Sequence, residues 1–200
     1  MPSEQLNSDE RLSRSPLLMN RAESALLVVD IQERLLPVQP EGPRVVWNAR
    51  RLIDGATALD VRIAVTEHVP AKMGPTAPLL AERLPTPHTK AAFSGVACEE
   101  LVRGWQDAGV RHVVLVGFET HVCIAQTALD LLSAGFEPKV VVDAVGSRFT
   151  IDHKTALKRL DASGVTLATT EAVLCEWCET SADPAFRTVS ALTKEKQPGL

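Results

Sequence analysis

Among the 200 residues of this chain, Cys123 has the surroundings that most favour chemistry. It follows an apolar run, Val113 to Val116, and a turn that begins at Gly117, and we expect it in the first turn of a helix spanning about residues 121–133. Unpaired amide N–H groups at a helix N-terminus favour negative charge, so we expect a thiol there to have a lowered pKa. The same N–H groups can bind a developing oxyanion. The alternative is that Cys123 is a small buried hydrophobe, as free cysteines usually are.

Two further cysteines, Cys175 and Cys178, form a CxxC pair near the C-terminus. Such a pair can carry out thiol–disulfide exchange. A structural zinc site would need two more ligands, and the nearest along the chain is His153. The competing interpretation is a C-terminal helix whose apolar residues pack against the core or a neighbouring subunit; these residues are Val173, Leu174 and Trp177.

Reactive side chains need elements that hold them in place, and here the apolar pattern predicts alternating strands and helices. Strands are expected at residues 25–30, 62–66, 112–116, 139–143 and 165–168, and helices from residue 45 and at 97–108, 121–133 and 152–162. Because crossovers between parallel strands are right-handed, this alternation predicts a mostly parallel sheet with helices on both faces. The expected fold class is therefore α/β, as a doubly wound, three-layer α/β/α single domain.

The expected ligand site lies outside the carboxyl ends of the strands, where the strand order reverses. Asp30 and the turn at residues 117–123 both lie at such ends. We expect a six-stranded sheet of order 3-2-1-4-5-6, in which the strands ending at Asp30 and Val116 are neighbours, although the sequence alone does not fix this order. A strand-end acid that only caps the following turn is the alternative for Asp30.

Composition narrows the classes of partner. With 45% hydrophobic residues and no composition break, the chain can build one substantial core. The balance of 21 basic and 25 acidic residues gives a net charge of −4, and there is no basic cluster, so we expect no nucleic-acid partner. The longest apolar runs are far below the roughly 20 residues that span a bilayer, so we expect no membrane partner.

The two ends of the chain differ from its middle. Residues 1–20 are polar and without period, so we treat them as a mobile or partner-packed extension. They also lack the apolar stretch of a secretory signal, and four cysteines are too few for a dense disulfide framework. A cytoplasmic location is the resulting expectation, with one folded domain at residues 21–195 and a tail at 196–200.

The segment from Gly117 to Leu131, Gly-Phe-Glu-Thr-His-Val-Cys-Ile-Ala-Gln-Thr-Ala-Leu-Asp-Leu, resembles the nucleophile segment of isochorismatase-like cysteine hydrolases. Four more segments resemble the family in the same order, and together the similarity covers roughly residues 22–193. These segments are residues 25–32, ending in Asp-Ile-Gln; 66–76, with Thr-Glu-His-Val-Pro and Gly-Pro-Thr; 89–94, Thr-Lys-Ala-Ala-Phe-Ser; and 141–148, Val-Val-Asp-Ala-Val-Gly-Ser-Arg.

The resemblance implies roles for individual residues: Asp30 is the general base, Lys90 its cationic partner and Cys123 the nucleophile. It also implies a cis peptide between Phe118 and Glu119, and an oxyanion hole made by the backbone amides of Glu119 and Cys123. A thiol beside a carboxylate and an ammonium group can pass its proton to the carboxylate and attack a carbonyl carbon. Taken alone, Lys90 is more simply interpreted as a solvated loop lysine, and only its occurrence together with Asp30 and Cys123 favours the catalytic role.

The nicotinamidase branch of the family adds a metal site built from one aspartate and two histidines. Here the corresponding segment, Thr66 to Pro70, holds a single histidine, His68. Two-ligand remnants bind metals poorly, so we predict no metal and no other cofactor. Pyridine amides are then disfavoured as substrates, and the chain resembles the amidase-like branch of unassigned substrate.

Three residues near the implied catalytic group are candidates for the substrate pocket: Gln32, Phe93 and His121. His121 also suggests a Cys–His dyad with Cys123. Because residues two apart on a helix point in different directions, we favour a pocket-wall or capping role for His121 instead.

The sequence thus predicts a hydrolase that acts on a small amide-like substrate through a thioester at Cys123. The alternatives are a catalytically silent interaction or scaffold protein on the same fold and, less favoured, a thiol–disulfide protein that uses Cys175 and Cys178. Family resemblance implies a homo-oligomer. Thiol labelling distinguishes the enzyme from the catalytically silent protein: for the enzyme, we expect Cys123 to react with iodoacetamide at neutral pH faster than the other cysteines.

Overall fold

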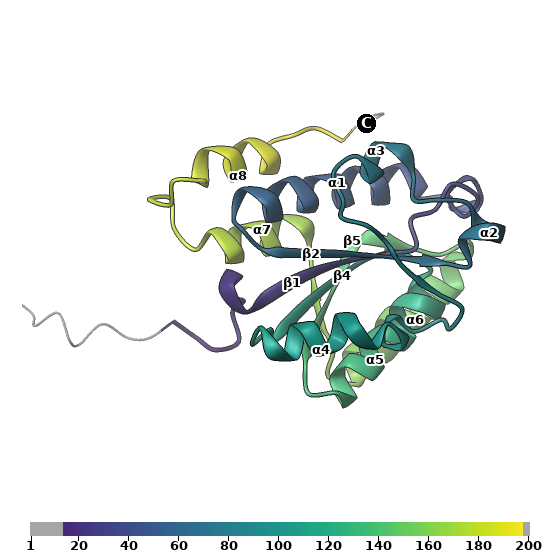
Figure 1. The fold of residues 1–200 in the computed structure, drawn as a ribbon. Coiled ribbons are helices and arrows are strands. Elements are labelled where there is room, and N and C mark those ends of the chain that lie inside the picture. The colour runs from purple at the N-terminus through teal and green to yellow at the C-terminus, as the bar shows by residue number, and fades with distance from the viewer. Residues whose placement is uncertain (1–13, 198–200) are drawn as a thin grey trace, which may run out of the picture.

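The computed structural model describes residues 14–197; residues 1–13 of the expected extension and 198–200 of the expected tail lie outside this range. Its centre is one sheet of six parallel strands in the order β3-β2-β1-β4-β5-β6, which confirms the expected order (Figure 1). The strands are β1 (Ser24–Val29), β2 (Arg62–His68), β3 (His88–Lys90), β4 (His112–Phe118), β5 (Glu137–Gly146) and β6 (Thr166–Ala168).

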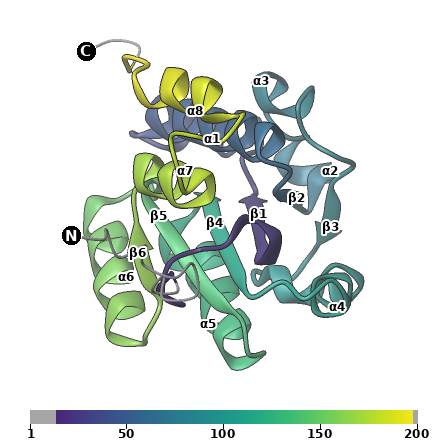
Figure 2. The same ribbon diagram turned by 90° about the vertical axis from the view of Figure 1, so that its left-hand side faces the viewer.

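Helices cover both faces of the sheet and give three layers (Figures 1 and 2). One layer holds α1 (Gly42–Ala58), α3 (Pro78–Ala81), α7 (Thr170–Cys178) and α8 (Phe186–Thr193). The other holds α4 (Glu99–Asp107), α5 (Ala125–Ser133) and α6 (Thr150–Ala162). A single-turn helix, α2 (Pro70–Met73), lies in the long connection between β2 and β3.

Strand β1 shows why the fold forms as it does. All six of its residues are buried, because a central parallel strand contacts helices on both faces. Leu26 and Val28 pack toward α1, whereas Leu27 and Val29 pack toward α4 and α5. The continuous apolar run in the sequence therefore marks the middle of the sheet.

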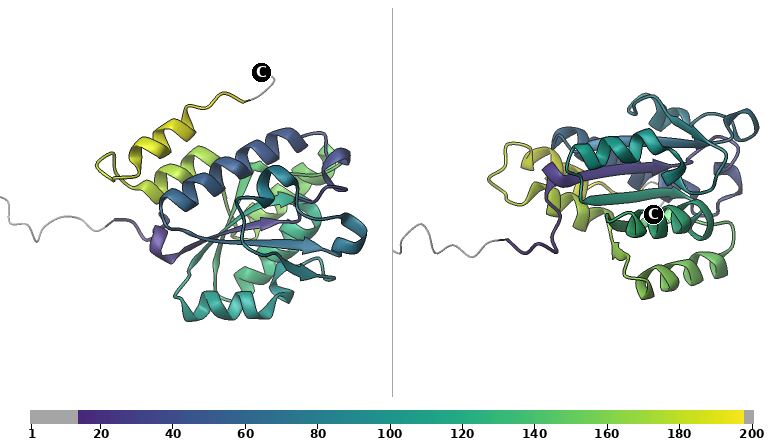
Figure 3. Two further views of the ribbon diagram at one scale, coloured as in Figure 1. Left: turned by 45° about the horizontal axis from the view of Figure 1, so that its top comes forward. Right: turned by 60° about the horizontal axis from the view of Figure 1, so that its bottom comes forward.

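The C-terminal helices complete the layer that contains α1. Val173, Leu174 and Trp177 of α7 and Val189 and Leu192 of α8 are buried in the same cluster as α1. Figure 3 shows α7 and α8 lying beside α1. The apolar side of the CxxC helix therefore packs against the core of its own chain.

Residues before β1 are also attached to this layer. The Met19 side chain is buried in the same cluster, and its backbone N–H donates to Glu176 of α7 over 3.0 Å. Arg14 forms an ion pair with Glu179. Within residues 14–197, no helix combines the length and the apolar character that crossing a bilayer requires.

Candidate active site

The carboxyl end of β1 fixes the position of Asp30. Val29 lies opposite Thr66 of β2 on one side and Gly117 of β4 on the other. Asp30 follows immediately, with a φ of 52°, and its N–H donates to the Thr66 carbonyl over 3.1 Å. Its carboxylate is fully buried at the middle of this edge of the sheet.

Gly117 allows the neighbouring strand to come close at the same level. Its φ is +121°, and a Cβ atom added there would lie 2.0 Å from the Val29 carbonyl oxygen. No side chain fits at that distance. Glycine is therefore required for β4 to turn beside Asp30 toward the segment that contains Cys123.

Strand β3 brings Lys90 to the same carboxylate. Lys90 lies opposite His68 in β2, and its Nζ donates to Asp30 Oδ2 over 2.6 Å and to the Phe93 carbonyl over 3.0 Å. Thr66 Oγ1 donates to the other carboxylate oxygen over 2.8 Å. The Lys90 side chain is only 1% exposed, so the alternative of a solvated loop lysine is wrong.

Cys123 lies in a π-helical turn, Thr120–Ile124, that links β4 to α5. The expected α-helix therefore begins at Ala125, and the placement of Cys123 in its first turn is corrected to this wider turn. The Glu119 carbonyl accepts from the N–H groups of Val122 and Ile124, over 3.0 and 3.2 Å. These bonds fix the turn, which brings the thiol close enough to Asp30 and Lys90 for both charges to shift its pKa.

The Cys123 thiol is not activated in the way that we expected. Burial raises its pKa to about 12, and the negative charge of Asp30 raises it further than the positive charge of Lys90 lowers it. The expectation of a lowered pKa is therefore wrong, because desolvation outweighs the favourable N–H groups. The thiol is protonated at neutral pH and lies beside a carboxylate that can accept its proton.

A cavity of about 220 Å³ opens beside this group. Cys123 and Phe93 line it, together with Leu35, Val38, His68, Met73, Phe118, Glu119, Val122 and Arg148. Of the three pocket candidates from the sequence, Phe93 lies in the wall, half exposed and stacked near His68 with ring centroids 5.4 Å apart.

The other two candidates lie elsewhere, and their expected places in the pocket are corrected. Gln32 is buried, and its side-chain amide binds the backbone of His68 and Gly74 at both ends, so it holds the connection after β2 in place. His121 is not among the residues that line the cavity, and its Nδ1 forms a hydrogen bond with Ser147 Oγ over 3.1 Å. The polar partners of both side chains come from residues distant in the sequence, so the residues next to Gln32 and His121 could not indicate them.

Sequence reasoning missed His68 and Arg148 as cavity residues. His68 is the last residue of β2, and Arg148 follows β5 by two positions. The rule that ligand sites collect at the carboxyl ends of parallel strands could have identified both.

Glu119 lies where the cavity meets the nucleophile turn. The Phe118–Glu119 peptide bond is cis, at the position that the resemblance implies. Burial opposes ionisation of the Glu119 carboxylate, but hydrogen bonds from Gln39 and Arg148 hold its pKa below the ordinary value. Within the described residues, the Glu119 N–H donates no hydrogen bond to the protein.

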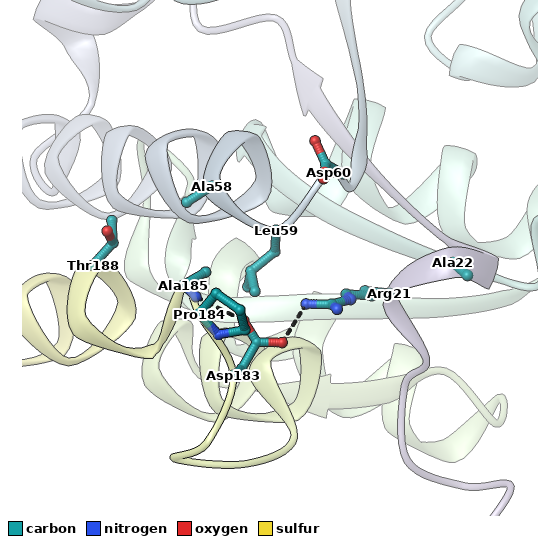
Figure 4. A pocket seen from close by; sticks show the side chains of 9 residues that line it. All are labelled: Arg21, Ala22, Ala58, Leu59, Asp60, Asp183, Pro184, Ala185 and Thr188. Carbon is teal, nitrogen blue, oxygen red and sulfur yellow. Dashed lines mark hydrogen bonds and ion pairs between the residues drawn. The ribbon is translucent and has the colours of Figure 1, made fainter.

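Figure 4 shows a larger cavity, of about 630 Å³, on the opposite side of the sheet. Its wall includes Arg21, which precedes β1, and Asp60, which precedes β2, so it lies at the amino ends of the strands. Asp183 pairs with Arg21 there, with atoms 2.7 Å apart. No cysteine lines this cavity, and the chemistry described above is confined to the smaller one.

Residues 24–172 match the family model described as the isochorismatase domain. The isochorismatase domain-containing protein 2 of Danio rerio is 39% identical over 176 residues, covering 88% of this chain and 89% of that protein. The solved structure of a MAR1 ribonuclease from Caenorhabditis elegans has a TM-score of 0.84 and 36% identity, covering 90% of this chain and 94% of that one.

A more distant structure shares the fold alone: the ycaC gene product of Escherichia coli, an octameric hydrolase of unknown specificity. Its TM-score is 0.80 at 24% identity, over 90% of this chain and 92% of that one. The family match spans all of the strands that position the buried acid, the lysine and the thiol. By the extent of that match and by its close relatives, this chain belongs to the isochorismatase family.

Proposed function

We propose that this protein is a cysteine hydrolase that cleaves the C–N bond of a small amide. The observation that supports this most is the buried contact of three groups of different chemistry, Asp30, Lys90 and Cys123, beside a small cavity. A purely structural role would not account for this combination, because a stabilising ion pair does not require a thiol beside it and a buried structural thiol does not require an ion pair.

The first half of the reaction begins with a protonated thiol. As the Cys123 sulfur attacks the carbonyl carbon of the amide, its proton passes to Asp30. The Lys90 ammonium group, in contact with Asp30, compensates the negative charge as that charge moves from the carboxylate to the sulfur. Asp30 then returns the proton to the departing nitrogen, the C–N bond breaks, and a thioester remains on Cys123.

The second half regenerates the enzyme with the same groups. Asp30 takes a proton from water, the resulting hydroxide attacks the thioester carbon, and the C–S bond breaks. Asp30 then reprotonates the sulfur, and a carboxylic acid leaves. In both halves, charge on the carbonyl oxygen is stabilised by backbone N–H groups, for which we propose those of Glu119 and Cys123; the unpaired Glu119 N–H supports this assignment.

Hydrolysis of a panel of small amides tests the proposal, with release of ammonia or amine as the readout. We expect Cys123→Ala and Asp30→Asn each to lower kcat/KM by about a thousandfold or more. The matched control is Cys175→Ser, which changes an exposed thiol outside the cavity and is expected to leave the rate unchanged. Equal rates in Cys123→Ala and the unchanged protein would contradict the role of Cys123, and no turnover of any amide would favour a silent scaffold.

RNA cleavage is a second candidate, favoured by the name ribonuclease that the similar Caenorhabditis elegans structure carries. The net charge of −4 and the size of the cavity favour a small amide instead. The same variants should be assayed on labelled single-stranded RNA, where cleavage that depends on Asp30 would replace the amide proposal.

Two proposals concern the protein as a whole. We propose a homo-oligomer, supported by the octameric state of the structurally similar Escherichia coli protein and by exposed apolar side chains such as Leu79 and Ile151. We also propose the cytoplasm as its location, supported by the four cysteines, all of which are unpaired thiols.

A further inference from the structure

The side chain of Glu119 is held by two loops that come from distant parts of the sequence. Its Oε1 accepts three hydrogen bonds: from Gln39 Nε2 over 3.2 Å, from the Arg148 backbone N–H over 3.2 Å and from Arg148 Nε over 2.9 Å. Gln39 lies between β1 and α1, and Arg148 follows β5. One carboxylate oxygen therefore joins both loops to the residue that precedes the turn with Cys123.

Ionisation of Glu119 strengthens these contacts. Its side chain is only 11% exposed, and burial by itself would favour the neutral acid. Hydrogen bonds from Gln39 and Arg148 nevertheless hold the Glu119 pKa below its ordinary value, so the carboxylate is charged at neutral pH. Hydrogen bonds to an ionised acceptor are roughly twice as strong as those between neutral groups.

The contact leaves Gln39 with one unpaired polar atom. An ionised carboxylate can only accept, so Gln39 must present its NH₂ group to Glu119. Its own Oε1 is then buried without a hydrogen-bond partner among residues 14–197. A buried polar atom without a partner destabilises a protein, so a role in the site explains the contact with Glu119 better than stability does.

The main chain of Glu119 is held as well. Its carbonyl accepts from the N–H groups of Val122 and Ile124, over 3.0 and 3.2 Å. Glu119 is thus fixed at its carbonyl by the turn and at its side chain by two loops, while its own N–H donates to no group of the described chain. An N–H group stabilises a developing oxyanion most when its position is fixed before the reaction.

We propose that the Glu119 carboxylate is a positioning residue, which together with Gln39 and Arg148 fixes the Glu119 N–H against the carbonyl oxygen of the substrate. The proposal rests on the hydrolase function and on the oxyanion role of this N–H, both proposed above. The carboxylate acts through the N–H rather than on the reacting atoms. Its loss should lower kcat by about 10- to 100-fold with little change in KM, because a displaced donor weakens the transition state alone.

Two electrophiles separate the oxyanion site from the thiol. Allyl bromide has no carbonyl oxygen: the Cys123 sulfur bonds to its saturated carbon, bromide leaves, and no oxyanion forms. Butanal adds through its carbonyl carbon, the thiol proton ends on the carbonyl oxygen, and the reversible tetrahedral adduct places that oxygen where the oxyanion would lie. The measurements, at one fixed pH, are the alkylation rate of the peptide that contains Cys123 and the butanal concentration that halves this rate.

Glu119→Ala and Gln39→Leu should each weaken butanal binding by about tenfold or more. Both should leave the rate with allyl bromide within about twofold, because nothing that activates the thiol is removed. Glu119→Gln keeps an oxygen acceptor and should retain part of the butanal affinity. The control is Gln106→Leu on α4, an exposed glutamine outside the cavity, which should leave both measurements unchanged.

Stability gives a further readout that a merely structural contact would move. Gln39→Leu also removes the unpaired Oε1, so its melting temperature should not fall. If Glu119→Ala does not fold, Gln39→Leu and Glu119→Gln decide the test.

Unchanged butanal affinity in Gln39→Leu, a parallel loss of both reactivities, or no butanal binding to the unchanged protein would overturn the proposal. Failure of the hydrolase function would appear separately, as absence of amide turnover in the unchanged protein while the expected pattern of butanal binding persists.

Discussion

Asp30 accepts hydrogen bonds on both carboxylate oxygens, from Lys90 on one and Thr66 on the other, and it also contacts the Cys123 thiol. Burial makes each of these contacts stronger than it would be in water. Burial also makes each of these side chains depend on the others, because removal of one partner of a buried ion pair leaves an unpaired charge and destabilises the fold by about 3–5 kcal/mol. At the scale of single residues, the site is therefore one coupled group rather than three independent side chains.

This coupling predicts opposite effects of two substitutions on the thiol. Asp30→Asn removes a negative charge that raises the Cys123 pKa, so the pKa should fall below about 12 and the thiolate should form at lower pH. Lys90→Met removes a positive charge that lowers the same pKa, so the thiolate should form at still higher pH. The measurement is the pH titration of thiolate ultraviolet absorbance, with each variant compared with its Cys123→Ser counterpart.

The same substitutions separate thiolate content from catalysis. Asp30→Asn should hold more thiolate than the unchanged protein at a given pH and yet hydrolyse amides far more slowly, because the proton acceptor is gone. If its activity instead rises with its thiolate content, the thiolate is the resting nucleophile and Asp30 has another role.

At the scale of elements, the site depends on the close approach of β1 and β4. Gly117→Ala would place a methyl group 2.0 Å from the Val29 carbonyl oxygen, at a φ that side chains rarely adopt. We expect the free energy of unfolding to fall by about 3 kcal/mol or more, measured by denaturant titration. Gly104→Ala, on α4 with no atom within 4 Å of the added methyl, is the matched control and should raise that free energy by about 0.5–1 kcal/mol. Similar small effects of both changes would contradict the requirement for close approach.

The sheet could be read from the sequence where its strands are long and buried. The five strands expected from the apolar pattern are all present, because central strands such as β1 are apolar on both faces. A sixth strand was expected, but β3 was not located in the sequence, since its three residues are too short to show alternation; it nevertheless positions Lys90. Lys90 could therefore be assigned only through family resemblance.

Two features of the site could not be read from residue types. The π-helical turn at Cys123 differs from an α-helix by its backbone hydrogen bonds, which leave no mark on the apolar period. The raised pKa of Cys123 follows from burial, which sequence neighbours do not report. The expectation that Cys123 reacts fastest at neutral pH loses its physical basis for the same reason.

At the scale of the whole molecule, both ends of the described chain reinforce the layer built by α1. Met19 is buried beneath α7, and Arg50 of α1 pairs with Glu195 beyond α8. The carboxyl edge of the sheet holds the site, and the opposite edge holds the separate cavity near Asp183. Both ends of the described chain thus stabilise one helical layer, and the site lies apart from them at the carboxyl edge of the sheet.

Assembly is the prediction that belongs to this scale. Static light scattering on protein eluting from a size-exclusion column should give a mass that is an integer multiple, two or more, of 21.6 kDa. Exposed apolar side chains favour association, because each Å² of apolar surface that is removed from water in an interface stabilises the complex by about 25 cal/mol. A mass of one chain across the micromolar range would contradict the proposed homo-oligomer.

The central claim is that Cys123 forms a covalent acyl intermediate with the help of Asp30 and Lys90. Its most direct test is rapid acid quenching during turnover of an amide, followed by intact-mass and peptide mass spectrometry. The account predicts an added mass equal to the acyl group on the peptide that contains Cys123, absent from Cys123→Ser and reduced in Lys90→Met. Steady hydrolysis with no such adduct on Cys123, or hydrolysis that persists in Cys123→Ser, would contradict it.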